Sequence, residues 1–157
     1  MTWLGLFCAV FAVLMIAHTK TREAVRGLSE AEAFFMLVTH IESEIRNYRT
    51  PLSEILSRDG GILEEIGFMD EARAFVLSGI PPVYRGKALT SDEKDAIDRL
   101  FAALGSGTAA EEERRCRIAI ELLGASVEKR KEYLPKEKRL YRVSAISLSL
   151  MLLILFI

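Results

Sequence analysis

Two apolar ends that carry no charge bracket this chain of 157 residues, and every charged residue lies between them. The 21 Lys and Arg residues and the 22 Asp and Glu residues all fall between Lys20 and Arg142. Trp3–Ala17 is apolar throughout, and Val143–Ile157 contains only apolar residues and three serines. This distribution predicts an N-terminal membrane anchor over 1–19, a central domain over 20–142 and a C-terminal membrane anchor over 143–157.

The length of each apolar end is short for a membrane span. Seventeen helical residues counted from Met1 cover roughly 25 Å, against a hydrocarbon layer of about 30 Å. A secretory signal peptide is the alternative for the first end, but Met1-Thr2-Trp3 has no positive charge. A buried core helix is the alternative for the second end, although Leu150–Ile157 contains no polar residue. We expect a transmembrane helix at each end.

Basic residues flank the central side of both predicted anchors. They are Lys20, Arg22, Arg26, Lys129, Arg130, Lys131, Lys136, Lys138, Arg139 and Arg142. Because Lys and Arg collect on the cytoplasmic side of a membrane, both flanks predict a multi-pass cell-membrane protein whose central domain is cytoplasmic. The same residues could also bind anionic headgroups.

The central domain has the apolar periodicity of helices and none of the alternation of strands. The sequence predicts an all-α fold, a bundle of five to six helices between the two anchors. One helix is expected over 24–48, either continuous with the first anchor or broken near Gly27, where Ser29 and Glu32 have capping-box spacing. Its expected inward residues are Leu28, Ala31, Phe35, Val38, Ile41, Ile45 and Tyr48.

Start and stop signals divide the rest of the domain. Thr50-Pro51 predicts a short helix capped by Thr50, and Gly79 ends a helical segment that begins near Ile62. Capping boxes at Thr90–Glu93 and Thr108–Glu111 predict two further helices. The last helix should bury Cys116, Ile120, Leu123, Val127 and Leu134. Pro135 favours a kink before the second anchor.

Residues able to carry out chemistry are few. A net charge of −1 argues against nucleic-acid binding. His18 and His40 lie outside any metal-binding motif, and Cys8 and Cys116 are placed where no disulfide is expected. Gly105–Thr108 fits a helix stop better than a phosphate loop. We therefore predict no catalytic residue, no metal site and no cofactor, and a non-enzymatic function.

The one long loop, residues 80–89, is the predicted site for a protein partner. Pro81-Pro82 stiffens it, which lowers the entropy lost on binding. Tyr84 and Arg85 are residue types enriched at binding hot spots, and Lys87 adds a second positive charge. Local packing and solvation are the alternative explanation for these residues.

The order of features along nearly the whole chain resembles the stage III sporulation protein AB family of endospore-forming bacteria. The resemblance is carried by short segments in a particular order: IESEI at 41–45, TPLSEIL at 50–56, LTSDEK at 89–94, LFAALG at 100–105 and EKRLYR at 137–142. Ser106-Gly-Thr108 and Pro135 depart from the family pattern, as do Ser144, Ala145 and Ser147, which stand where the family has a glycine pair.

This resemblance implies a mother-cell membrane component of a secretion-like channel between mother cell and forespore. It also implies a central domain similar to platform proteins of type II secretion and type IV pilus machines, and docking of a cytoplasmic ATPase, stage III sporulation protein AA. Self-association remains open. The alternative function is a membrane-anchored helical sensor or regulator that binds a ligand.

Overall fold

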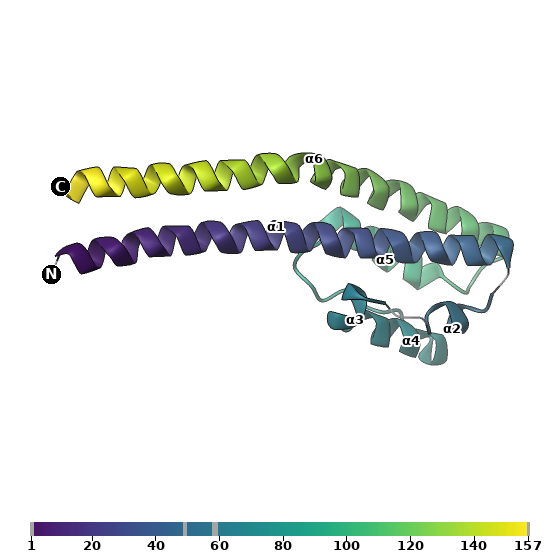
Figure 1. The fold of residues 1–157 in the computed structure, drawn as a ribbon. Coiled ribbons are helices and arrows are strands. Elements are labelled where there is room, and N and C mark those ends of the chain that lie inside the picture. Colours follow the sequence, from purple (N-terminus) through teal and green to yellow (C-terminus); the bar gives the residue numbers. More distant parts are fainter. Residues whose placement is uncertain (1, 49, 58–59, 157) are drawn as a thin grey trace. The chain divides into compact units, whose positions relative to one another are not determined.

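The computed structural model describes residues 2–48, 50–57 and 60–156, and no side chain is described for 1–10, 152–153 and 155–157. Within this part the chain forms six α-helices and no strand, as predicted (Figure 1). The helices are α1 (Thr2–Asn47), α2 (Leu52–Ile55), α3 (Ile62–Glu65), α4 (Phe68–Ser78), α5 (Ser91–Ala103) and α6 (Ala109–Phe156).

Internal contacts divide the chain into two units. The end unit consists of Met1–Arg26 and Arg130–Ile157, and the central unit is Gly27–Lys129. In the end unit, the first part of α1 and the last part of α6 run antiparallel and side by side (Figure 1). In the central unit, α4 packs against the short helices α2 and α3.

The predicted localisation as a multi-pass membrane protein is wrong for the part of the chain that the structure describes. No helix there combines the length and the apolar character needed to cross a bilayer, so the predicted flanking transmembrane helices are not supported. A span needs about 20 predominantly apolar residues. The C-terminal apolar stretch begins directly after Arg142 and contains three serines. The side chains of residues 1–10, 152–153 and 155–157, in the outer parts of the predicted anchors, lie outside the described residues.

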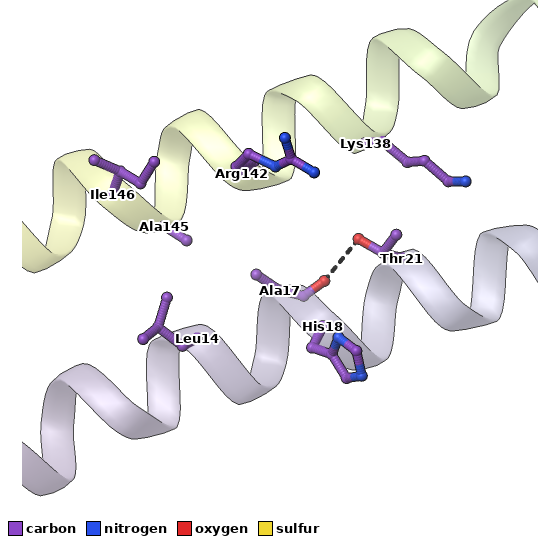
Figure 2. A pocket seen from close by; sticks show the side chains of 8 residues that line it. All are labelled: Leu14, Ala17, His18, Thr21, Lys138, Arg142, Ala145 and Ile146. Atoms are coloured by element: carbon purple, nitrogen blue, oxygen red, sulfur yellow. Dashed lines mark hydrogen bonds between the residues drawn. The ribbon is translucent and has the colours of Figure 1, made fainter.

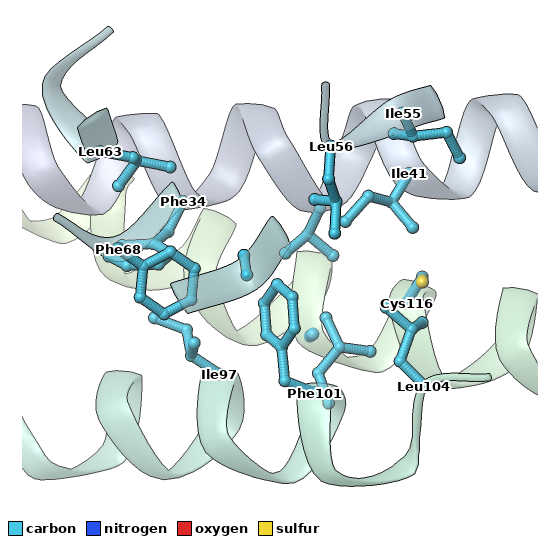
Figure 3. Packing of buried hydrophobic residues seen from close by; sticks show 14 of the residues in the cluster. Phe34, Ile41, Ile55, Leu56, Leu63, Phe68, Ile97, Phe101, Leu104 and Cys116 are labelled. Carbon is cyan, nitrogen blue, oxygen red and sulfur yellow. The ribbon is translucent and has the colours of Figure 1, made fainter. Parts of the chain in front are cut away.

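The core of the central unit gathers apolar side chains from all six helices (Figure 3). Aromatic rings connect three of them. Phe34 on α1 meets Phe68 on α4 with 4.7 Å between ring centroids, and Phe68 meets Phe101 on α5 at 5.3 Å, both edge to face. Edge-to-face pairs add stabilisation to that of the buried area. The cluster therefore fixes α4 and α5 to the inner face of α1.

The inward face of α1 differs from the prediction at three positions, the first of which is Leu28, which is only partly buried. Phe34 is fully buried, whereas Phe35 is only partly buried and Tyr48 is 74% exposed. Ala31, Phe34, Val38, Ile41 and Ile45 form the buried stripe. On α6, Cys116, Leu123 and Val127 are buried as predicted, while Ile120 and Leu134 are only partly buried.

Both predicted capping boxes of the later helices are confirmed. Thr90 caps α5 and exchanges hydrogen bonds with Glu93, and Thr108 and Glu111 do the same at the start of α6. Thr50 does not cap α2, because its hydroxyl donates to the Glu44 carboxylate at 2.6 Å. The prediction that the helix continues from the first apolar end is confirmed, since α1 is one continuous helix, and the alternative of a break near Gly27 is wrong.

Pro135 does not end α6, which continues to Phe156. Proline removes one backbone donor and crowds the preceding turn, so it usually kinks or breaks a helix. The turns on both sides of Pro135 nevertheless stay helical.

Candidate partner-binding site

The loop after α4 begins at a tight helix end. Gly79 has φ +70°, a left-handed conformation that a residue with a side chain adopts only at a cost. Its N–H donates to the Phe75 carbonyl oxygen at 2.8 Å. The next N–H, that of Ile80, donates to the Ser78 hydroxyl at 3.2 Å. The chain therefore leaves α4 in a direction fixed by backbone and side-chain hydrogen bonds.

Glu71 on α4 holds the middle of the loop. One carboxylate oxygen accepts a hydrogen bond from the Val83 N–H at 3.0 Å. The other pairs with the Arg85 guanidinium at 3.1 Å. One α4 side chain therefore fixes both the backbone and a charged side chain of the loop.

Tyr84 anchors the loop to the core. Its side chain is buried, its hydroxyl donates to the Glu30 carboxylate on α1, and the same hydroxyl accepts from the Ala88 N–H at 3.2 Å. Burial, together with the Glu30 carboxylate, raises the pKa of Tyr84 to about 12. A side chain at Gly86 would collide with the Tyr84 hydroxyl, which explains the glycine there.

Three large apolar side chains at this fixed turn point to solvent. Leu77 is 92% exposed, Ile80 is 71% exposed and Val83 is 51% exposed. We call these three residues the corner surface. Large exposed apolar side chains close together in the sequence at an ordered turn are candidates for an interaction site. Because the turn is already ordered, binding there would lose little conformational entropy.

Of the three residues predicted to bind a partner, two are exposed and one is buried. Arg85 and Lys87 are exposed, and the Arg85 side chain is 80% accessible. Tyr84 is only 2% exposed, so it positions the loop and cannot present its ring to a partner. Its burial depends on Glu30, a partner far away in the sequence.

Sequence reasoning missed the corner surface. Leu77, Ile80 and Val83 gave a signal, because they are large apolar residues around a Gly and a Pro-Pro pair, where no helical face can bury them all. The sequence pattern assigned them only to the end of a helix and to the loop that follows it. Residue types enriched at hot spots drew attention to Tyr84 instead.

Of the predicted membrane-flanking basic residues, Lys129 belongs to the central unit and the others lie in the end unit. Two lysines of the end unit pair with carboxylates. Lys20 pairs with Glu23 at 2.9 Å, and Lys136 pairs with Glu132 at 2.8 Å. Each carboxylate raises the pKa of its lysine. Arg22 and Arg139 are exposed.

Lys138 and Arg142 line an open groove of about 250 Å³ between the α1 and α6 segments of the end unit (Figure 2). Its other lining residues are Leu14, Ala17, His18, Thr21, Ala145 and Ile146. Figure 2 shows the Thr21 hydroxyl donating to the Ala17 carbonyl oxygen, at 2.9 Å. That hydroxyl is therefore used within its own helix.

The potentially reactive side chains of the central unit are buried or lie near other side chains. Burial raises the pKa of the Cys116 thiol to about 12, and such a thiol is a poor nucleophile. His40 lies 3.9 Å from Glu44, one turn along α1. Among the residues that the structure describes, no three His, Cys, Asp or Glu side chains are grouped as metal ligands.

Comparison with known protein families identifies a match over the second half of the chain. The family model described as stage III sporulation protein AB matches residues 78–157, which include loop 80–89, α5 and α6. No curated protein and no solved structure matches the chain.

Proposed function

Because this chain belongs to the stage III sporulation protein AB family, and so has a sporulation-related role, we propose that it is a non-enzymatic docking subunit of a secretion-like channel complex. In this function the central unit binds a cytoplasmic ATPase, stage III sporulation protein AA, through the corner surface. Arg85 and Lys87 form the charged rim of that contact. The observation that carries the proposal is the exposure of Leu77, Ile80 and Val83 on a turn that is held in place.

The chemistry of the turn fits a protein partner better than a small molecule. A small-molecule site is concave and surrounds its ligand with a few convergent polar groups. The corner surface instead presents apolar side chains outward, and Glu71 already holds the nearest polar groups of the loop. Apolar anchors with a polar rim are the pattern of protein interfaces.

A non-enzymatic function agrees with how the reactive side chains are used. Cys116 is buried in the core cluster, and Glu93 caps α5. We expect His40→Ala to leave function intact when the protein remains folded and abundant. Loss of function in a folded, abundant His40→Ala variant would contradict this part of the proposal.

Co-purification from sporulating cells tests the proposal. The tagged full chain should recover the ATPase, and a variant with Leu77→Ser and Ile80→Ser should recover much less. Met36→Ser is the matched control, because Met36 is also apolar and 67% exposed but lies on α1, outside the corner surface. Equal recovery with all three proteins would reject the corner surface as the docking site.

A further inference from the structure

A second exposed apolar surface lies on α6 within the central unit. Ile118 is 49% exposed, Leu122 is 56% exposed and Ala125 is exposed as well. Their spacing of four and three residues places them in one stripe along the helix. The buried residues Cys116, Ala119, Leu123 and Val127 occupy the other side of α6. The stripe therefore faces away from the core of the central unit.

Charged residues follow one flank of this stripe. Arg114, Glu121 and Glu128 are exposed and are spaced seven residues apart, so they share one side of the helix. The positive charge of Arg114 lies before the apolar stripe in the sequence, and the negative charge of Glu128 lies after it. Read in the opposite direction, the same flank offers negative and then positive charge. At its two ends, Arg114 and Glu128, this flank is therefore complementary to a reversed copy of itself, whereas Glu121 in the middle meets a like charge.

We propose that the Ile118–Leu122–Ala125 stripe binds the same stripe of a second copy of this chain, with the two helices antiparallel. Ile118 of each copy then packs beside Leu122 of the other, as in an antiparallel coiled coil. In this register Arg114 lies opposite Glu128 of the second copy, and the two-fold symmetry forms this pair twice. In a parallel pair, each flanking charge would lie at the same height as the same residue of the other copy. Like charges would then share one level along the helices.

The same register makes a prediction about Glu121. It lies midway between Arg114 and Glu128, close to the two-fold axis, so it meets its own copy. Two carboxylates at the axis repel each other. Removing this charge should therefore strengthen the dimer, whereas most substitutions in a real interface weaken it.

Sedimentation equilibrium of the purified full chain over a range of concentrations tests the proposal. The parent protein should show a monomer–dimer equilibrium, and Leu122→Glu should weaken dimerisation by at least about tenfold, as loss of a central anchor does. Met36→Glu is the matched control and should dimerise like the parent. A parent that stays monomeric, or a Leu122→Glu variant that dimerises equally well, would overturn the proposal.

Charge reversal tests the antiparallel register. Arg114→Glu should weaken the dimer, and adding Glu128→Arg to it should restore the parent affinity, because the pair is re-formed with reversed signs. Glu121→Gln should tighten the dimer. Circular dichroism should show the same helix content in each variant, since all three positions are exposed. Failure of the double variant to recover, or weaker dimerisation of Glu121→Gln, would contradict the register.

Discussion

The hydroxyl of Tyr84 donates a hydrogen bond to the carboxylate of Glu30, 54 positions earlier in the chain, and both residues are buried. This contact fixes the loop that follows α4 to the long helix α1. Phe34, on the same helix, packs edge to face on the Tyr84 ring with 5.6 Å between centroids. The loop that carries Arg85 and Lys87 is therefore an extension of the core, although it contains no regular secondary structure.

Tyr84→Phe tests how much this contact contributes. The ring would still fill its site, but the Glu30 carboxylate would lose one donor and the Ala88 N–H would lose its acceptor. We expect the free energy of unfolding to fall by about 1–3 kcal/mol, measured by urea denaturation. Tyr48→Phe is the control, because Tyr48 is 74% exposed and should change stability very little. Equal stability of the two variants would show that the buried hydrogen bond contributes nothing.

The pH dependence of stability provides a separate test of Tyr84. Its pKa is raised from 10.0 to about 12 in the folded protein. The unfolded chain therefore loses this proton first, and the stabilisation that is fully present below about pH 10 is lost as the pH rises toward 12. The stability difference between parent and Tyr84→Phe should be constant up to about pH 10 and shrink above it. A difference that stays constant through this range would contradict the raised pKa.

The two capping boxes offer a matched comparison. Glu93 is 3% exposed and accepts a further hydrogen bond from the Ser126 hydroxyl on α6, whereas Glu111 is exposed. Glu93→Ala should lower the free energy of unfolding by about 2–3 kcal/mol, because the cap and a hydrogen bond to a charged group are both lost. Glu111→Ala should cost about 1 kcal/mol or less. Urea denaturation of both variants would reveal the difference, and equal losses would contradict a structural role for the contact with Ser126.

Local signals predicted the helices well because each depends on neighbouring residues. The Thr90–Glu93 box and Gly79 act within one turn, so their spacing in the sequence is sufficient. The prediction of Phe35 as the inward ring was wrong, because two adjacent aromatic residues both fit a stripe with three- and four-residue spacing and the residue chosen was not the buried one. Only packing against Phe68 shows which ring is buried.

The candidate site was predicted in part, and the reason is the distance between partners in the sequence. Loop 80–89 was identified from its prolines and its residue types. The burial of Tyr84 depends on Glu30, and the fixed position of Val83 depends on Glu71, 12 positions away. Neither contact leaves a local signal. The exposure of Leu77 also follows from the tertiary fold, because its helix buries only the face that contains Phe68, Ala72 and Phe75.

Direct binding of the purified sporulation ATPase to the full chain tests the central claim, that the corner surface docks this partner. Isothermal titration calorimetry should show binding to the parent chain and to the Met36→Ser control with equal affinity. The Leu77→Ser, Ile80→Ser double variant should bind at least about tenfold more weakly while retaining the helix content and stability of the parent. Parent-like affinity in that double variant would contradict the claim.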